Sequence, residues 1–386
     1  MARNALARLG DLGQSVWCDE ISRKLLLTGG LESLITDDGV TGVTSNPTIF
    51  HKAIANGAEY DERIRESFSG GMGAEEIAES LVVEDIRLAA DTLESVHSET
   101  GGRDGWVSIE VAPKWARDFE RSVSEVMRIR KLVDRPNVMV KVPATDEGVA
   151  AFRELTGRGY CVNVTLIFSL ERYRQVVEAY LTGLEALVAR RSKGNDVAGL
   201  GDVHSVASFF VSRVDTAVDE RLDALAAQRG AGGESSSKDA DRLRSLKGKA
   251  AVANAKQAYR LFREAFGDPR WEALRSAGAN LQRPLWASTS TKNPAYSDIM
   301  YVQELIGSDT VNTIPLETLA LFRDHGRAEE ETITTDAEEA GAHLGLLADT
   351  GLDLEAVAQM LEKDGVNAFA SSYEALIAAV QEKSVS

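Results

Sequence analysis

A lysine lies on the inward face of a predicted β-strand. In residues 137–144 (NVMVKVPA), three valines alternate with Met139 and Lys141. Alternation places the valines on one face of the strand and Lys141 on the other. Burying an ammonium group costs several kcal/mol unless it is paired or loses its proton. Lys141 is therefore predicted either to form a structural ion pair or to act as an amine of lowered pKa that attacks a carbonyl carbon.

Other predicted strands also carry polar residues on their inward faces or at their ends. In residues 106–112 (WVSIEVA) and 161–168 (CVNVTLIF), the apolar residues alternate with polar ones. One inward polar residue is often a satisfied core residue, but barrel interiors favour Val, Ile and Leu, so packing alone does not explain a larger set. Two carboxylates in different surroundings can divide acid and base work between two steps. The predicted site set is Asp19, Asn46, Glu110, Lys141, Asn163 and Thr165.

The elements that must position this set are short strands that alternate with longer helices. Repeated βα units predict a parallel sheet, and eight of them predict a closed (β/α)₈ barrel. A doubly wound open sheet is the alternative, although it usually has fewer strands. The predicted strands are residues 15–19, 42–46, 106–112, 137–144, 161–168, 203–211, 284–289 and 310–316, and helical periodicity marks residues 74–97, 115–132, 170–191 and 214–228.

The chain is predicted to be a single α/β domain spanning residues 1–386. Residues 190–201 are polar and contain glycine, and residues 230–238 (GAGGESSSK) have the composition of a helix-to-helix loop. Both are interpreted as insertions or linkers, and neither marks a domain boundary, because strand segments continue after each of them. Residues 350–386 are predicted to be C-terminal helices that cover the barrel.

Composition excludes several classes of function. The chain has 43 Lys and Arg against 60 Asp and Glu, a net charge of −17, which weighs against binding to nucleic acid or to an anionic membrane. An anionic substrate would then need a local patch of Lys or Arg. No apolar stretch approaches the ~18 residues of a membrane span. The first residues also lack the apolar block of a signal peptide. With only Cys18 and Cys161 the chain has no disulfide framework, and a cytoplasmic location is predicted.

Motifs for cofactors and metals are missing from the sequence. The five histidines are scattered without ligand spacing, so no metal site is predicted. There is no G-x-G-x-x-G after a strand, no Walker loop, no G-x-S-x-G and no H-E-x-x-H. A nicotinamide dehydrogenase is therefore disfavoured, and no cofactor is predicted.

Around the residues of the predicted site set, the sequence resembles the transaldolase family. The C-terminal KDGVNAFASSYEALIAAV is similar to the family's last helix, so the resemblance covers nearly the whole chain. The longer insertions resemble the larger bacterial branch of the family. The matching segments, in family order, are VWCDEISR around Asp19, TSNPTIF around Asn46, VSIEVAP around Glu110, NVMVKVPAT around Lys141, CVNVTLIFSLERY around Asn163 and Thr165, ASFFVSRVD around Ser208 and Arg213, and RPLWASTSTKNP around Ser288 and Lys292.

The resemblance implies a (β/α)₈ barrel of class I aldolase type with extra helices, and a Schiff-base mechanism without metal or cofactor. It implies transfer of a dihydroxyacetone unit from sedoheptulose 7-phosphate to glyceraldehyde 3-phosphate, which gives erythrose 4-phosphate and fructose 6-phosphate in the non-oxidative pentose phosphate pathway. The implied partners are sugar phosphates, with no nucleic acid and no membrane, and the expected assembly is a monomer or a homodimer.

The resemblance also implies catalytic roles. Lys141 matches the Schiff-base lysine. Glu110 matches the carboxylate that, with Thr165 and an ordered water, shuttles protons while the carbinolamine loses water. Asp19 matches the acid/base that takes a hydroxyl proton during carbon–carbon cleavage and returns it during addition.

Substrate contacts follow in the same way. Asn46 and Asn163 match groups that hold the dihydroxyacetone hydroxyls, Ser208 matches a substrate contact, and Phe210 matches an aromatic ring beside the Schiff base.

Phosphate binding is assigned by the resemblance to Arg213, and Ser288 matches a further substrate contact after the seventh strand. Some family members have a second phosphate-binding arginine in that region. Here the sequence reads STSTKNP, so Lys292 is expected to replace it. Lysine keeps the charge but lacks the planar fork of arginine.

Two other functions remain open. A fructose 6-phosphate aldolase would release free dihydroxyacetone, although such chains are much shorter, and in the resemblance a glutamate at the Glu110 position favours transfer. A catalytically silent barrel could serve as a binding protein, but Lys141 together with two carboxylates argues against it.

Overall fold

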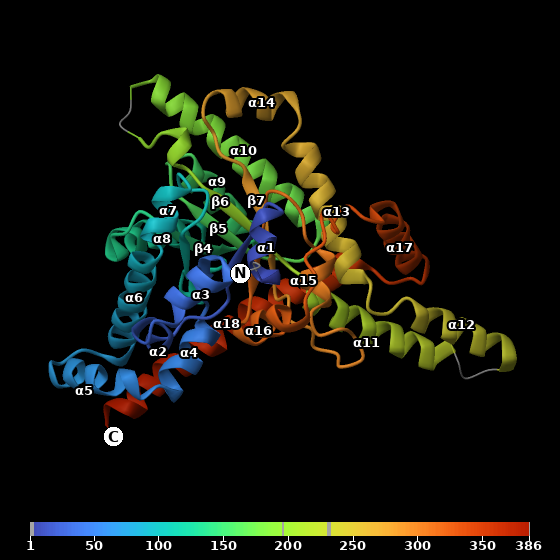
Figure 1. Cartoon of the computed structure of the whole chain (residues 1–386), viewed down its shortest axis with the longest axis horizontal. Coiled ribbons are helices and arrows are strands. Elements are labelled where there is room, and N and C mark those ends of the chain that lie inside the picture. The colour runs from blue at the N-terminus through green and yellow to red at the C-terminus, as the bar shows by residue number, and fades with distance from the viewer. Residues whose placement is uncertain (1–3, 195–196, 230–232, 386) are drawn as a thin grey trace.

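Eight parallel strands close into a barrel in the computed structural model (Figure 1), which describes residues 4–194, 197–229 and 233–385. Each strand pairs with the next one along the chain, and the last pairs with the first. The predicted barrel is confirmed, and the open sheet is excluded. The strands are β1 (Gln14–Cys18), β2 (Val40–Thr44), β3 (Trp106–Glu110), β4 (Val138–Pro143), β5 (Val162–Ile167), β6 (Ser205–Phe210), β7 (Gln282–Ala287) and β8 (Thr310–Ile314).

Helices surround the barrel in the described part of the chain. They are α1 (Ala5–Asp11), α2 (Arg23–Leu27), α3 (Gly30–Asp38), α4 (Pro47–Asn56), α5 (Asp61–Ser69), α6 (Ala74–Thr92), α7 (Glu94–Glu99), α8 (Phe119–Val133), α9 (Asp146–Thr156), α10 (Leu170–Ser192), α11 (Ser212–Arg229), α12 (Gly233–Ser245), α13 (Ala250–Ala265), α14 (Pro269–Ser276), α15 (Met300–Glu304), α16 (Leu316–His325), α17 (Ala337–Asp349) and α18 (Leu354–Ser384), with the 3₁₀ turns η1 (Ala58–Tyr60), η2 (Pro113–Trp115) and η3 (Leu200–Asp202). No helix in the described ranges is long and apolar enough to cross a bilayer.

Strand register brings the inward polar residues to one level. Glu110 pairs with Lys141 between β3 and β4, and Lys141 pairs with Asn163 between β4 and β5. Since all strands are parallel, their carboxyl ends open on the same end of the barrel, where barrel enzymes place their active sites. The strand boundaries lie within two residues of the predicted ones. β2 and β7 are each shifted by two residues at both ends, so Pro284 pairs within β7 rather than starting it.

Alternation breaks at the end of β5. The pairing of β5 with β6 is irregular between Val164 and Ile167, and Leu166 adopts a positive φ of 61°. The simple alternation of apolar and polar residues that the sequence predicts for residues 161–168 therefore does not extend to the end of this strand. Leu166 instead contacts α18 at Gly365, where a Cβ would come within 2.8 Å of the leucine side chain. Glycine at this position lets α18 approach the end of β5.

Two helical predictions need correction at their ends. Residues 74–97 form two helices rather than one, because α6 ends at Thr92 and α7 begins at Glu94. The helix predicted from residue 115 begins at Phe119, because η2 precedes it and the Asp118 side chain caps it by accepting a hydrogen bond from Arg121 N–H. Acidic N-caps of this type start helices efficiently.

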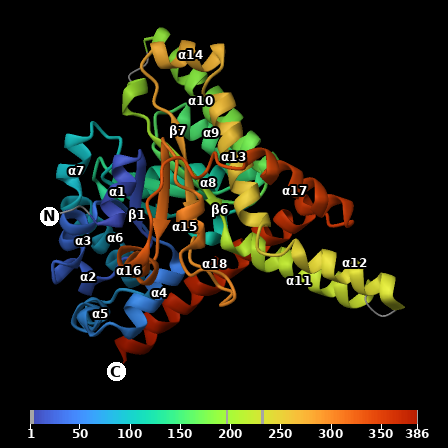
Figure 2. The ribbon, with the colours of Figure 1, turned by 45° about the vertical axis from the view of Figure 1, so that its right-hand side comes forward.

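The insertion predicted as a loop at residues 230–238 is partly helical. Residues 230–232 lie outside the described residues, and α12 begins at Gly233. Low-complexity composition suggested a loop, but Ala240, Leu243 and Leu246 repeat every three residues and are buried. α11 and α12 contact each other and form a hairpin that projects from the barrel on the side away from α5 (Figure 2).

In the insertion at residues 190–201, α10 continues to Ser192, so its first residues are helical, and residues 195–196 lie outside the described residues.

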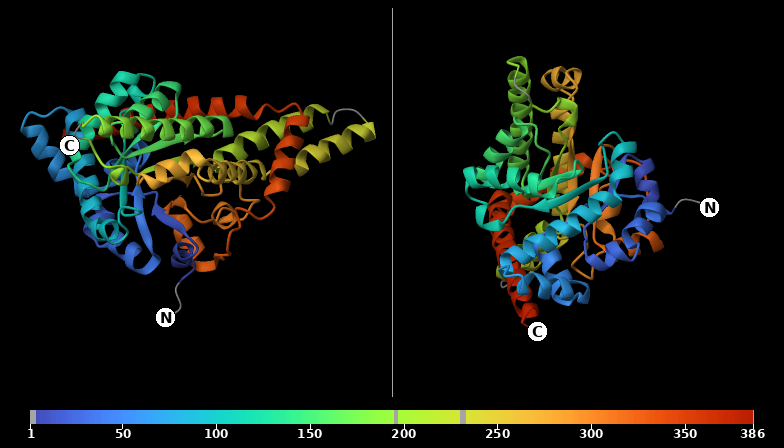
Figure 3. Two further views of the ribbon diagram at one scale, coloured as in Figure 1. Left: turned by 90° about the horizontal axis from the view of Figure 1, so that it is seen from above. Right: turned by 90° about the vertical axis from the view of Figure 1, so that its left-hand side faces the viewer.

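The C-terminal segment contains one long helix where several were predicted. α18 runs along one side of the molecule and ends beside α5 (Figure 3). It contacts α4, which follows β2, and η2, which follows β3, as well as β5 itself. It therefore crosses the end of the barrel at which these strands finish.

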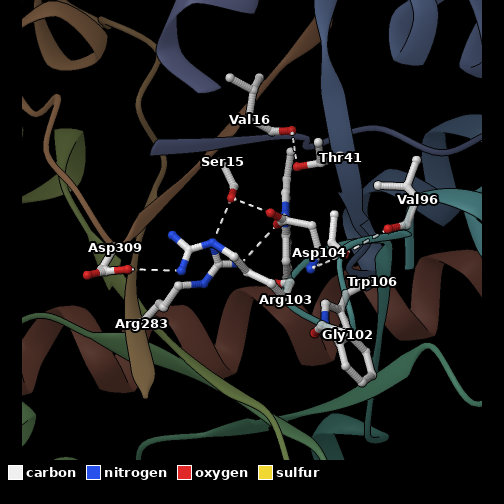
Figure 4. A network of polar contacts seen from close by, with 12 residues as sticks. Ser15, Val16, Thr41, Val96, Gly102, Arg103, Asp104, Trp106, Arg283 and Asp309 are labelled. Carbon is white, nitrogen blue, oxygen red and sulfur yellow. Dashed lines mark hydrogen bonds and ion pairs between the residues drawn. The ribbon is translucent and has the colours of Figure 1, made fainter. Parts of the chain in front are cut away.

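A buried polar network closes the opposite end of the barrel (Figure 4). Arg283 forms a 3.0 Å ion pair with Asp104 and donates hydrogen bonds to Ser15 Oγ (2.7 Å) and to the Arg103 carbonyl (2.7 Å). Ser15 in turn donates to the second oxygen of Asp104 at 2.7 Å. Because each charged group has several partners, the network can remain buried without an unpaired charge. It fixes the entry of β1, β3 and β7 at the end away from the predicted site.

Candidate active site

A cavity of about 660 Å³ opens at the carboxyl ends of the strands. It collects side chains from β2, β4, β5, β6, β7 and β8, and from segments that follow strands, such as Asp19 after β1. Its charged lining contains the cations Lys52, Lys141, Arg213 and Lys292, together with the acidic residues Asp19, Glu20, Asp298 and Glu317. The predicted residues that line it are Asp19, Asn46, Lys141, Thr165, Ser208, Phe210, Arg213, Ser288 and Lys292.

Lys141 is only 5% exposed and points into this cavity. Its Nζ donates a hydrogen bond to the Ser45 carbonyl oxygen at 3.0 Å and lies 3.5 Å from Glu110 Oε2. The ring of Phe369, from α18, lies 5.9 Å from Nζ. A single long ion pair and one carbonyl leave the amine partly unsatisfied on its cavity side. The ion pair and the reactive amine, which the sequence left as alternatives, are therefore compatible in one arrangement.

Asp19 follows β1 and faces the same cavity. Thr44 Oγ1 donates a hydrogen bond to Asp19 Oδ1 at 2.6 Å. Burial raises the pKa of Asp19, while Thr44 and then Lys141 oppose the shift by favouring the charged form. A carboxylate with a raised pKa is suited to exchange protons with a substrate hydroxyl.

Glu110 lies behind Lys141 and is not part of the cavity wall. Burial raises its pKa, and the neighbouring ammonium of Lys141 opposes that shift. Thr165 Oγ1 is buried, lines the cavity, and has no hydrogen-bond partner among the described residues. Buried polar groups without a protein partner are commonly satisfied by water. Thr165 Oγ1 is therefore free to bind a water in the cavity, and its joint role with Glu110 stays a prediction.

Asn163 lies beneath the cavity rather than in its lining. Its Nδ2 donates to Ser108 Oγ at 3.1 Å, and its Oδ1 accepts a hydrogen bond from Ser208 Oγ at 2.7 Å. The Asn163 amide therefore holds Ser208, which does line the cavity. Asn46 begins α4, where its Oδ1 accepts a hydrogen bond from Ile49 N–H at 3.0 Å. The capping bond fixes the orientation of the Asn46 amide at the cavity edge.

Arg213 stands in the first turn of α11, where the helix dipole also favours an anion. Its guanidinium lies over the ring of Phe210, 5.5 Å from the centroid. Within the described ranges, no carboxylate forms an ion pair with it, which disfavours an ordinary paired surface arginine. Ser288 contacts Ser212 at the start of the same helix (Oγ to Oγ, 2.9 Å), and the exposed Lys292 donates to Ser290 at 2.6 Å.

Sequence reasoning missed four residues around the site. Thr44 and Thr313 contact Asp19 directly or through each other, and Ser45 contributes the carbonyl that holds Lys141. Thr44 and Ser45 stand directly before Asn46 in a predicted strand, so the strand end gave a usable signal. Phe369 comes from a helix more than two hundred residues away along the chain, and nothing in its local pattern marks it.

Metal ligands do not gather in the described ranges: no group of three or more His, Cys, Asp or Glu side chains is placed to hold an ion. The site instead offers one buried amine, the carboxyl groups of Asp19 and Glu110, and an outer part that carries both basic and acidic side chains. This combination suits chemistry at a carbonyl carbon through a lysine adduct.

Comparison with known proteins agrees with this geometry. A sequence model of the Transaldolase/Fructose-6-phosphate aldolase family matches residues 16–380. "Transaldolase 2" of Streptomyces coelicolor is 46% identical over 374 residues, which cover 97% of this chain and 95% of that protein. "Transaldolase" of Thermobifida fusca is 46% identical over 372 residues, 96% of each chain. "Transaldolase" of Saccharopolyspora erythraea is 45% identical over 378 residues, 98% of this chain and 97% of that protein.

These matches span the barrel, the insertions and the C-terminal helix. The chain therefore belongs to the transaldolase/fructose-6-phosphate aldolase family, and the relatives that match it over nearly their whole length are named transaldolase.

Proposed function

We propose that this protein transfers a dihydroxyacetone unit from sedoheptulose 7-phosphate to glyceraldehyde 3-phosphate through a Schiff base on Lys141. The observation that carries the proposal is the buried Lys141 amine in the cavity wall, with Glu110 on one side and Asp19 across the same cavity. The products would be erythrose 4-phosphate and fructose 6-phosphate. A lysine adduct supplies the electron sink, so the chain's own residues suffice for the reaction.

The first half of the reaction forms and uses the iminium. The Lys141 amine attacks the ketone carbon of the donor, and Glu110 passes protons through a water at Thr165 while the carbinolamine loses its hydroxyl as water. The positive iminium then accepts the electron pair of the breaking carbon–carbon bond. Asp19 takes the proton of the adjacent hydroxyl, whose oxygen becomes the carbonyl of the departing aldose.

The second half reverses these steps with another aldehyde. The retained enamine attacks the acceptor carbonyl carbon, and Asp19 returns its proton to the new hydroxyl. Water then releases the ketose from Lys141. Asn46 is proposed to hold the dihydroxyacetone hydroxyls, and Asn163 is proposed to act with Ser208, which it orients by a hydrogen bond.

A test of transfer separates this function from simple aldol cleavage. Fructose 6-phosphate incubated without an acceptor should be consumed slowly, since the enamine waits for an aldehyde. Addition of erythrose 4-phosphate should start rapid formation of glyceraldehyde 3-phosphate and sedoheptulose 7-phosphate. A coupled assay measures this formation. Equal consumption with and without the acceptor, with free dihydroxyacetone as product, would support a fructose 6-phosphate aldolase instead.

Phosphate recognition is proposed for Arg213, with Ser288 and Lys292 beside it. Arg213→Ala should lower kcat/KM for fructose 6-phosphate by roughly 30- to 150-fold, as expected for a charge-assisted contact of ~2–3 kcal/mol. The loss should appear mainly in KM. Unphosphorylated fructose has no phosphate to lose, so its slower turnover should change little. Steady-state assays of both sugars test this, and an equal loss on both would transfer the assignment to Lys292.

The setting is proposed as cytoplasmic. Both cysteines, Cys18 and Cys161, are free and buried, as suits a reducing compartment. We also propose that residues 1–386 act as one domain, because α18 packs across the barrel that the earlier residues build. A monomer or a homodimer is the proposed assembly.

A further inference from the structure

Two threonines, one on β2 and one on β8, form a row of hydrogen bonds that ends at Asp19. Thr44 ends β2, Thr313 lies in β8, and β1, which leads into Asp19, lies between these two strands. Thr44 Oγ1 is 2.6 Å from Asp19 Oδ1 and 2.5 Å from Thr313 Oγ1. Both threonines are 2% exposed and line the substrate cavity together with Asp19.

The number of protons available fixes the direction of the hydrogen bonds that join Thr313, Thr44 and Asp19. A hydroxyl has one proton to donate, and an ionised carboxylate can only accept. Thr44 must therefore give its proton to Asp19 Oδ1. Thr44 then has none left for Thr313, so Thr313 donates to Thr44. Hydrogen bonds that run in one direction strengthen each other, and in a dry site an unmade bond is costly.

We propose that Thr313 is a positioning residue that acts through Thr44 on Asp19, so that Asp19 Oδ1 is occupied and Oδ2 is left to take the substrate proton. This inference rests on the acid/base role proposed for Asp19. In the cleavage step the substrate O–H bond breaks and its proton bonds to Oδ2. The O–H electron pair forms the new aldehyde carbonyl, and the pair of the carbon–carbon bond moves into the iminium. No proton crosses either threonine.

The backbone around Thr313 is suited to hold this geometry. Thr289, from the segment after β7, has its Oγ1 3.0 Å from Asn312 Oδ1 and 3.3 Å from the Thr313 carbonyl oxygen, so its one proton is shared between these two acceptors. β8 pairs with β1 through Cys18 and Ile314, and Asp19 N–H continues the ladder by donating to the Ile314 carbonyl at 2.9 Å. Asp19 and Thr313 are therefore fixed to the same pair of strands.

Other charged groups also act on Asp19 and must be considered in any pH test. Lys141 on β4, Lys292 after β7 and Arg213 on α11 favour its charged form, and the neighbouring Glu20 and Glu110 on β3 are like charges. None of these five groups is altered by a change at Thr313. A shift in the pH profile of a Thr313 variant therefore reports on the hydrogen-bond chain.

The test compares Thr313→Val, Thr313→Ser, Thr44→Val and the double valine variant. Valine keeps the shape of threonine without the hydroxyl, and serine keeps the hydroxyl. Single-turnover reactions with fructose 6-phosphate should separate two steps. Imine formation is measured by borohydride trapping on Lys141, and carbon–carbon cleavage is measured by the release of glyceraldehyde 3-phosphate. Melting temperatures identify a variant that fails to fold, and Thr313→Ala then replaces the valine variant.

We expect imine formation at the wild-type rate in every variant. Cleavage should slow by ~10- to 100-fold in Thr44→Val and by about 3- to 10-fold in Thr313→Val, with Thr313→Ser close to wild type. The acidic limb of the cleavage rate should move to higher pH in both valine variants, because loss of the donor chain disfavours ionised Asp19. The double variant should be no slower than Thr44→Val, since Thr313 acts only through Thr44.

Thr313→Val with wild-type cleavage and an unshifted acidic limb would overturn the proposal, and so would a double variant whose loss is the product of the two single losses. A wild-type enzyme that traps no imine would overturn the proposed function and this inference with it. Normal wild-type transfer combined with an unaffected Thr313→Val would overturn this inference alone.

Discussion

Lys141→Met abolishes transfer while the barrel stays folded: this is the expected result of removing the amine. The loss of kcat should be about 10⁵-fold or more, as for other enzymes that lose a covalent nucleophile. Methionine has a similar length and is apolar, so it fits the buried position. Glu110 then loses its ammonium partner, and in its buried site it is expected to take up a proton rather than remain charged.

The matched control is Lys114→Met, which also removes one lysine. Lys114 is exposed, pairs with Glu75 at 2.8 Å and does not line the substrate cavity. It should keep wild-type transfer, and both variants should melt cooperatively. Activity of Lys141→Met within tenfold of wild type would be incompatible with a lysine adduct at this position.

Asp19→Ala and Glu110→Ala should fail at different steps, each by ~10²–10⁴-fold, the usual contribution of general acid/base help. Asp19 serves carbon–carbon cleavage, so Asp19→Ala should still form the imine and accumulate it. Glu110 serves dehydration, so Glu110→Ala should form the imine slowly. Single-turnover trapping with borohydride measures imine formation separately from product release.

The pH dependence gives a second criterion for the same pair. Burial raises the pKa of both carboxyl groups above the ordinary range. Cleavage needs ionised Asp19, so its rate should fall as the pH drops through that raised pKa, above the pH at which an exposed aspartate would titrate.

Equal rates of imine formation in Asp19→Ala and Glu110→Ala would refute the division of labour.

Much of the fold could be predicted from the sequence because two patterns agree along most of the chain. Strands with alternating valines, such as the one that carries Lys141, recur between segments of helical periodicity, and that combination leaves few topologies besides the barrel. The same alternation placed Lys141 and Glu110 on inward faces of their strands. The strand register, which a linear pattern does not contain, makes them direct neighbours.

Features that depend on tertiary contacts could not be predicted. The break in β5 occurs at Leu166, which contacts α18 at Gly365, and α12 packs against α11. Phe369 reaches the cavity only because α18 crosses the barrel end.

Most of the predicted site residues line one cavity, and their roles stay predictions. Asn163 does not line it, because its amide is hydrogen-bonded to Ser108 and Ser208. Thr44 and Thr313 meet only because closure of the barrel places β1 between β8 and β2. A linear pattern does not contain the distance between two hydroxyls that are 269 residues apart.

The most direct test of the account is borohydride treatment of the wild-type protein with fructose 6-phosphate, followed by peptide mass analysis. The account predicts a three-carbon adduct on Lys141 and on no other lysine, including Lys52 and Lys292 in the same cavity. Omission of either sugar or borohydride should leave Lys141 unmodified. An adduct on a different lysine, or none under conditions in which the protein transfers dihydroxyacetone, would contradict the Schiff-base mechanism.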